Sequence, residues 1–576
     1  MSYFKRDRFS GIAPAVAPRL LSEDRAQTAQ NIDFESGKLV AIKDDSTAGS
    51  LTTSTRSSIF FYEYQSSSSA WLQWTADVDV VRGPIPDDEH DRFYYTGDGF
   101  PKMSRYDIAI SGQVYPAASY RLGVPAPTSA PTVSISGTAD TSLTPNDVSY
   151  VYTFVTAYGE EGPPSAPSTV TQMTDGQTAT LSLPNYGGSL GSINFGTGAL
   201  KRIYRSNTGS TNTQFQLVKE INYSDTSEPD DLAANALGEI LPSGTWIGPP
   251  DDQTSLYPSG PLQGLIALAQ GVFAGFSGKR FCLSEPFMPH AWPIDYRITT
   301  EDEIVAIAST ANGVAALTDG QPYFITGTDP SAMTAVRIDL RQACVNKNSV
   351  VDMGDYVLYA APDGLCAIQS ATGQVVTRGL ISVAQWNTDF YPTLIKAFRY
   401  EGTYVAFWTS GSSHGGWVFD PRSEQTSIST LSSSAQVKGG YTNPKTGELY
   451  LIVGSIIKKF RGGTSNKTLT WKTKKYVTSS PITMAWFSID ADTYPVGAKI
   501  YADGALIAHY YITKTSTNFV QTSYDSVGNV VSTTTLRGSA VMRVIATLAQ
   551  EWEVEVYGTD VNEFCLAQTM DEIRAT

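Results

Sequence analysis

The most constraining feature of the sequence is a unit of short apolar runs that recurs between residues 264 and 463. Each unit has one apolar run, a turn with Gly or Asn, a second run and often a third, as in EIVAIASTANGVAALTDGQPYFITG and VVDMGDYVLYAAPDGLCAIQS. Runs of this length between such turns predict antiparallel strands. Their recurrence at roughly 40 to 50 residues is typical of propeller blades. The sequence therefore predicts a β-propeller.

The composition supports an all-β fold class with several domains. The chain holds 31 Tyr, 23 Phe and 10 Trp, residue types that favour strands, and it lacks long stretches of Ala, Leu, Glu and Lys with helical period. Its 576 residues exceed what one core supports, roughly 250 to 300 residues. We expect five segments: an N-terminal arm with a short helix (1–45), the first part of the propeller (46–123), an inserted fibronectin-III-like β-sandwich (124–252), the remainder of the propeller (253–465) and a C-terminal β-sandwich (466–576).

The inserted sandwich is predicted from its boundaries and from alternation. A Pro-rich stretch, VPAPTSAPTV, precedes it and the breaker cluster GPPDD ends it. Between them Tyr150, Tyr152 and Phe154 alternate as strand residues do, and a Gly/Pro turn follows at 159–164.

The first 45 residues are predicted to form an arm that needs partners. Pro14 and Pro18 restrict the backbone to an extended entry. Ser22 is a candidate cap for a short helix over 25–29, and Gly37 turns the chain into a strand over 39–42. The last residues, LAQTMDEIRAT, are predicted to form a short amphipathic helix.

None of the sequence patterns that could serve catalysis or metal binding predicts an enzyme. Residues 411–415, GSSHG, match G-x-S-x-G, but a strand follows instead of the helix that a nucleophile elbow requires, so a hairpin loop is favoured. The acidic clusters DDEHD, EPDD and TTEDE are candidates for paired carboxylates or a cation site, and solvated loops explain them as well. The four histidines lack metal-site spacing. We expect no cofactor, no metal and no small-molecule substrate.

The four cysteines, Cys282, Cys344, Cys366 and Cys565, are far apart in the sequence. Neither a disulfide framework nor a zinc site is indicated, and reduced core thiols are expected. The opening MSYFKRDRFS has no apolar export core and no long apolar run occurs elsewhere, so we expect a soluble chain without a classical export signal.

The net charge of −15 argues against a protein that grips phosphates through a basic surface. Two interpretations stay open: solubility, or an acidic conduit wall along which DNA slides without sticking. One basic group occurs near the end of the predicted propeller. Its residues are candidate contacts to DNA or an acidic partner, although lysine protection of solvated strand edges is the favoured explanation: Lys458, Lys459, Arg461, Lys472, Lys474 and the adjacent Lys475.

The segment GIAPAVAPRLLSEDRAQTAQNIDFESGKL resembles the N-terminal signature of the nozzle, or tail tubular, proteins of short-tailed phages, in which a Gly/Pro arm precedes an A-Q-x-A-x-N helix and a G-x-L strand. YVYTFVTAYGEEGPPSAPS is similar to a sandwich phrase of such virion proteins, and EWEVEVYGTD with LAQTMDEI is similar to their C-terminal domain. The matching positions of the arm are Gly11, Pro14, Pro18, Ala26, Gln27, Ala29, Asn31, Gly37 and Leu39.

This resemblance implies a structural subunit of the virion tail, assembled in the host cytoplasm. It implies a homo-hexameric ring below the portal and adaptor, a tube through which double-stranded DNA leaves, and fibres or spikes attached to its side. On this reading the assembly arm is marked by Gly11, Pro14, Pro18, Gln27 and Asn31. Two alternatives are kept: a receptor- or glycan-binding tail protein that uses exposed aromatics, and a depolymerase that uses loop carboxylates.

Overall fold

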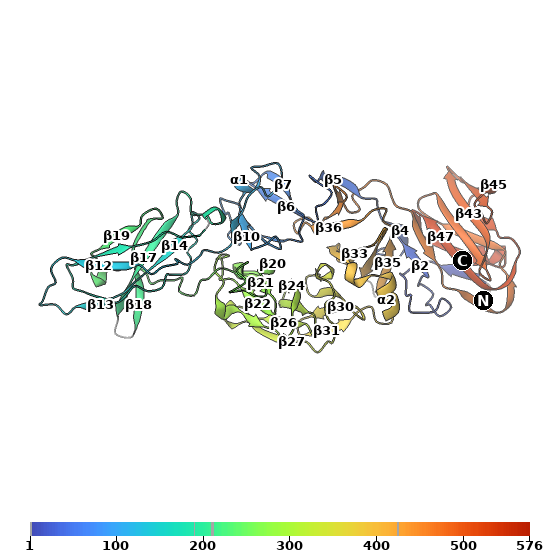
Figure 1. Cartoon of the computed structure of the whole chain (residues 1–576). Coiled ribbons are helices and arrows are strands. Elements are labelled where there is room, and N and C mark those ends of the chain that lie inside the picture. The colour runs from blue at the N-terminus through green and yellow to red at the C-terminus, as the bar shows by residue number, and fades with distance from the viewer. Residues whose placement is uncertain (1–2, 189, 209–211, 423–425, 576) are drawn as a thin grey trace. The chain divides into compact units, whose positions relative to one another are not determined.

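The computed structural model describes residues 3–188, 190–208, 212–422 and 426–575. The all-β prediction is confirmed, because the described chain consists largely of strands joined by turns (Figure 1). The described α-helices are short: α1 (Tyr106–Ala109), α2 (Val383–Asp389) and α3 (Met570–Ala575). None of them has the length to span a bilayer. The chain divides into two compact units. The first unit comprises Met1–Ile59, Gly320–Pro322 and Ile338–Thr576, and the second unit comprises Phe60–Asp319 and Tyr323–Arg337.

The second unit contains a series of antiparallel sheets in which each strand pairs with the next along the chain. The hairpin β6 (Ser58–Tyr64) and β7 (Ser68–Trp74) comes first. Three four-stranded sheets follow. Their strands are β8 (Asp79–Arg82), β9 (Phe93–Thr96), β10 (Lys102–Ser104) and β11 (Tyr120–Arg121); β20 (Gln263–Ala267), β21 (Phe273–Ser277), β22 (Arg280–Leu283) and β23 (Ile298–Thr299); and β24 (Ile304–Thr310), β25 (Gly313–Thr318), β26 (Tyr323–Thr326) and β27 (Thr334–Arg337).

Alternate residues of these strands build the cores. Phe276 and Phe281 lie directly opposite each other on β21 and β22, and both pack with Val314 and Ile325 of the next sheet. A period of two places every second side chain on one face of a strand, so each sheet has an apolar face to bury.

The insertion predicted between residues 124 and 252 forms two three-stranded antiparallel sheets around one core. The alternating Tyr150, Tyr152 and Phe154 lie in that core as predicted, together with Leu181 and Ile203. The sheets consist of β12 (Thr132–Ser136), β16 (Thr178–Ser182) and β19 (Ser227–Asp230), and of β14 (Tyr150–Val155), β17 (Leu200–Thr208) and β18 (Thr213–Asn222), with the pair β13 (Asn146–Val148) and β15 (Thr171–Met173) beside them.

The first unit contains three further arrays of four strands, and one of these arrays includes a strand from the start of the chain. The three-stranded run β36 (Val437–Thr442), β37 (Leu449–Val453) and β38 (Ile456–Lys459) is completed by β5 (Ser46–Ser50), which pairs with β38. One of the other two arrays consists of β28 (Val351–Asp352), β29 (Val357–Ala361), β30 (Gly364–Gln369) and β31 (Thr372–Val375). The other consists of β32 (Lys396–Tyr400), β33 (Thr403–Ser410), β34 (Ser413–Asp420) and β35 (Ser427–Leu431), which continue through β2 (Thr28–Gln30) into the C-terminal strands as one 12-stranded sheet.

The C-terminal segment forms two sheets that share one apolar core, and the N-terminal strand belongs to one of them. β1 (Tyr3–Arg6) pairs with β49 (Glu563–Ala567), which pairs with β41 (Trp486–Asp490) and through it with β46 (Val541–Arg543). The second sheet has β39 (Leu469–Lys472), β47 (Leu548–Gly558), β42 (Val496–Ala502), β43 (Ala505–Thr515), β44 (Asn518–Tyr524) and β45 (Val530–Arg537), with β40 (Tyr476–Thr483) also paired to β47.

The structure corrects two expectations about the arm. The short helix predicted over 25–29 is wrong, because β2 (Thr28–Gln30) forms there and pairs with both β35 and β39. The arm also does not stand apart from its own chain: Phe4, Phe9 and Ile12 are buried in the large core of the first unit. Strand partners and core contacts outweigh the weak helix preference of a short segment. The predicted C-terminal helix is present as α3.

Candidate functional site

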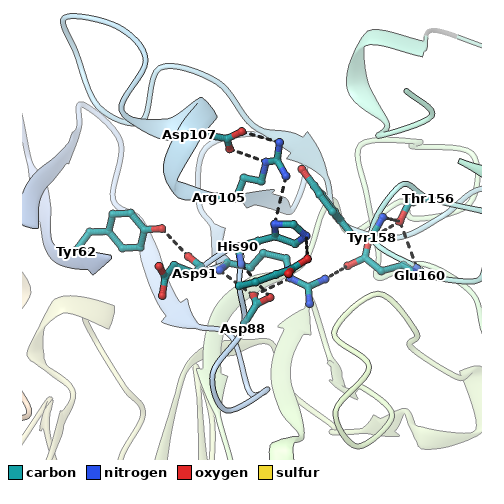
Figure 2. A network of polar contacts seen from close by, with 11 residues as sticks. Tyr62, Asp88, His90, Asp91, Arg105, Asp107, Thr156, Tyr158 and Glu160 are labelled. Atoms are coloured by element: carbon teal, nitrogen blue, oxygen red, sulfur yellow. Dashed lines mark hydrogen bonds and ion pairs between the residues drawn. The ribbon is translucent and has the colours of Figure 1, made fainter. Parts of the chain in front are cut away.

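A network of polar side chains lies in the second unit, where the acidic loop DDEHD meets a turn of the sandwich (Figure 2). The loop joins β8 to β9, and Asp87 and Asp91 adopt the left-handed backbone conformation that Asp tolerates in turns. Asp88 holds the loop together: its carboxylate accepts a hydrogen bond from the Arg92 backbone at 3.0 Å. The turn follows β14 and contains Tyr158 and Glu160.

Arg92 joins the loop to the sandwich. Its Nε donates to Asp88 at 2.8 Å and its Nη1 lies 3.3 Å from the carboxylate of Glu160. The side chains of Arg92, Asp88 and Glu160 are only 9, 9 and 10 % exposed. The guanidinium also lies 5.6 Å from the ring centre of Tyr158. One buried cation thus binds two carboxylates that belong to different parts of the chain.

A second cation, Arg105, contacts the same aromatic ring. It pairs with Asp107 at 2.6 Å, lies 3.3 Å from Nδ1 of His90, and stacks 5.1 Å from the centre of Tyr158. The ring of His90 is 5.0 Å from that of Tyr158. Figure 2 shows Tyr158 and His90 lying between the two sides of the network. The arrangement binds the turn through ring contacts as well as ion pairs.

The ionisation of the network favours a structural role. Burial acts to raise the pKa of Asp88, but the hydrogen bonds from Arg92 outweigh burial and hold that pKa below its ordinary value. A general acid requires the opposite shift, toward the working pH. Asp88 is therefore a fixed anion that serves as the counter-ion of Arg92.

A buried histidine lies close to the same carboxylates. His290 is 8 % exposed, and its ring packs edge-on against Trp246 at 6.1 Å. Burial lowers its pKa, and the charge of Arg92 adds to this while that of Glu160 opposes it. Burial is the largest of these effects, so the neutral form of His290 is favoured in the folded chain.

The sandwich itself contains buried charged side chains, whose burial the alternation of strand residues predicts only weakly. Lys201 and Arg205 share the face of β17 that carries the core residue Ile203, and both are almost fully buried. Arg205 pairs with Asp230 at 2.8 Å, with exposed fractions of 4 and 0 %. Lys201 and Arg205 stand two residues from Ile203 on either side, so the alternation that predicts core residues also predicts that these two cations are buried. This alternation was the sequence signal that could have identified them.

Lys201 has the pKa shift that is most often associated with catalysis, since burial lowers its pKa to about 8. However, its ammonium donates to the carbonyls of Leu183 and Asp225 and to the side chain of Asn185, at 2.9, 2.6 and 2.6 Å. All three protons are therefore used. Lys201 is a buried structural cation.

The predicted arm residues all lie against later parts of the same chain. Gly11 is packed so closely on Ile428 that a Cβ would meet that residue's carbonyl oxygen at 2.3 Å. The carbonyl of Pro14 accepts from Gln385 at 3.0 Å, and that of Pro18 accepts a backbone bond of 3.0 Å from the start of the C-terminal segment.

The two polar arm residues make long-range side-chain bonds. Gln27 donates to the carbonyl of Thr473 at 2.7 Å and also to the carboxylate of Glu553. Asn31 donates to Ser432 at 2.9 Å. Each of the five arm residues thus contacts a later part of the same chain, and the arm that carries them runs through the chain's own core.

The predicted basic group is brought together only in part, and most of its charge is neutralised. Lys458 lies half-buried in β38 and makes no side-chain ion pair among the described residues. The other cations each have a carboxylate partner: Glu448 for Lys459, Asp33 for Arg461 at 2.8 Å, Glu553 for Lys472 at 3.4 Å, Glu23 for Lys474 at 3.5 Å and Glu551 for Lys475 at 2.7 Å.

The other sequence candidates are structural. The GSSHG segment forms the hairpin between β33 and β34, as predicted. All four cysteines are free and buried, as predicted. Within the described residues no group of three or more His, Cys, Asp or Glu side chains is placed to hold a metal ion.

Comparisons with known proteins give no family for this chain. No family model matches it, and no curated protein matches it. Among solved structures, YCF48 from Cyanidioschyzon merolae is 11 % identical with a TM-score of 0.25, and covers 51 % of this chain and 94 % of its own. Dihydro-heme d1 dehydrogenase NirN, in complex with DHE, is 8 % identical with a TM-score of 0.23, and covers 68 % of this chain and 74 % of its own. Likenesses this weak carry no conclusion about fold or function.

Proposed function

We propose that the chain is a structural subunit of a tubular phage tail, one copy in a ring-shaped nozzle through which the genome leaves. The observation that carries the proposal is the path of the first fifty residues. They contribute β1, β2, β5 and the pair β3 (Ile32–Asp33) and β4 (Leu39–Ala41) to four separate sheets of the first unit. The unit therefore cannot be unravelled from its start without breaking several sheets, which suits a wall under mechanical load.

We further propose that the four-stranded sheets are blades of a β-propeller and that the insertion is a fibronectin-III-like sandwich. The support for the propeller is the regular succession of antiparallel sheets along the chain and the completion of the β36–β38 sheet by β5. Propellers commonly avoid a free edge by radial repetition of such sheets.

The charges fit a lumen that does not bind DNA. The residues predicted to contact phosphate are mostly paired with carboxylates of the same chain, and the net charge is −15. Affinity for the DNA backbone comes from unpaired Lys and Arg, which release counter-ions on binding. A wall on which most of these cations are paired would let DNA pass.

The receptor-binding alternative has less support. Among the described residues, Tyr3 and Phe287 are the exposed aromatic side chains, at 43 and 49 %. Sugar stacking needs a platform of exposed rings, so the glycan-binding interpretation lacks its main feature on this surface.

Electron microscopy of the purified full-length chain, alone and with the adaptor protein, tests the proposal, together with mass spectrometry of purified virion tails. We expect rings with a central channel and the chain in the tail fraction. A chain that stays monomeric under both conditions and is absent from tails contradicts the proposal. Trimers that bind a glycan array favour the alternative instead.

A further inference from the structure

The second unit contains an apolar groove beside the segments that lead into and out of the sandwich. Its cavity has a volume of about 640 Å³ and is lined by Pro125, Ile247, Leu256 and Ile294, among others. Leu256 and Ile294 are each 61 % exposed. Exposed aliphatic side chains around a hollow are typical of a surface that another molecule covers.

The groove also contains a cation without a partner. The guanidinium of Arg297 lines the cavity and stacks 5.6 Å from the ring centre of Tyr257. Its Nε and Nη2 are buried and have no hydrogen-bond partner among the described residues. The other cation of the groove, Arg121, is already paired with Asp251 and Asp252 at 3.1 and 2.9 Å. The groove therefore has an uncompensated positive charge, whose best complement is a carboxylate.

The first unit presents a segment with the matching properties. The hairpin of β44 and β45 exposes Val527, Val530 and Val531 at 81, 61 and 67 %. Asp525, at the base of its loop, is a half-buried carboxylate that accepts hydrogen bonds from the Asn529 side chain and from the backbones of Asn529 and Val527, and these hold its pKa below the ordinary value. The hairpin thus offers apolar side chains together with a fixed negative charge.

Among the described residues, one edge of the hairpin, along β45, is not paired with another strand. β45 is the last strand of its sheet (Figure 1), and its exposed residues carry no charge before Arg537. Uncharged edge strands are usually protected from self-association by Lys or Pro. This one has no such protection, which indicates that it is covered in the assembled state.

We propose that the β44–β45 hairpin of one copy docks into the Arg297 groove of a second copy. The contact joins two different surfaces of the chain, so it is head-to-tail and closes into a ring when the rotation between copies permits. This proposal rests on the proposed function, because copies of the chain must assemble for the contact to form. The contact would join neighbouring copies in the ring.

Cross-linking between singly substituted full-length proteins tests the contact. Val527→Cys protein is mixed with Leu256→Cys protein and treated with a short bis-maleimide; the native cysteines are all buried, so background is low. We expect a species of twice the chain mass in the mixture. Val170→Cys replaces Val527→Cys in the control mixture, because Val170 is also an exposed valine, at 67 %, and should give no such species.

Mass photometry gives the second readout. Val527→Asp should raise the concentration needed for assembly by about tenfold, the effect of losing one buried valine, whereas Val170→Asp should leave it unchanged. Oligomers that form without the cross-link and tolerate Val527→Asp overturn the contact but leave the proposed ring intact. Monomers at every concentration, with no cross-link, overturn both proposals.

Discussion

Replacing Arg92 by Ala should release the acidic loop from the sandwich turn. The substitution leaves two carboxylates, Asp88 and Glu160, at 9 and 10 % exposure without their cation. Breaking a buried ion pair from one side costs about 3 to 5 kcal/mol. The remaining exposure admits some water, so we expect the low end, about 3 kcal/mol, which is about a hundredfold in the local opening equilibrium.

Hydrogen exchange measured by mass spectrometry on the full chain checks this value, because it reports the opening of each segment without requiring two-state unfolding. Peptides that cover the loop and the turn should both exchange faster, while peptides from β33 and β34 should not change. Arg92→Lys keeps the charge but loses the forked geometry, so it should have a smaller effect.

The matched control is Arg337→Ala. Arg337 pairs with Glu301, but these side chains are 50 and 70 % exposed, and exposed pairs contribute less than about 1 kcal/mol. The reasoning is refuted if Arg92→Ala changes exchange no more than this control does.

The same pair predicts a pH dependence. The pKa of Asp88 is lower in the folded chain than in the unfolded chain. Its contribution to stability is therefore complete above the ordinary carboxyl pKa, about 3.9, and is lost as the pH falls through the pKa of Asp88 in the folded chain. The loop should therefore open in acid, and Arg92→Ala should remove this dependence.

Three further predictions concern packing and buried charge. Gly11→Ala should destabilise the first unit, because the new Cβ would meet the backbone of Ile428 at 2.3 Å, whereas Gly187→Ala, with no atom within 4 Å, should leave the thermal midpoint within about a degree. Asp230→Ala should cost about 3 to 5 kcal/mol in the sandwich, since it leaves a buried guanidinium unpaired, and an exchange change below about threefold would contradict this. His290 has a lowered pKa, so the folded chain loses stability as the pH falls below the unfolded value of about 6.5; the thermal midpoint of His290→Phe should fall less between pH 7 and pH 5 than that of the native chain.

The sequence alone was sufficient for the all-β class, and local patterns placed particular strand and turn residues correctly. Alternation in Tyr150, Tyr152 and Phe154 correctly placed them in a core, and the turn at GSSHG was correctly assigned to a hairpin. Both conclusions rest on local rules, the period of two along a strand and the turn preference of Gly and Ser, which do not depend on distant residues.

The sequence did not predict the partners of charged residues. The basic group around Lys472 was weighed as a phosphate contact, yet Lys472 faces Glu553 at 3.4 Å, eighty residues further along the chain. Likewise, DDEHD was read as a solvated loop or a cation site, and Asp88 instead holds Arg92 against the sandwich turn. An isolated charge cluster has the same sequence whether it is solvated, bound to a ligand or paired within the fold.

By itself, then, the sequence determined that this chain is built from short antiparallel strands with a sandwich inserted between sheets. Tertiary structure alone decided that the first residues become strands of distant sheets: Phe4 pairs with Leu566 and β2 replaces a predicted helix. The physical reason is that strand pairing and ion pairing join residues hundreds of positions apart, and the energy of each contact depends on a neighbour that no local pattern specifies.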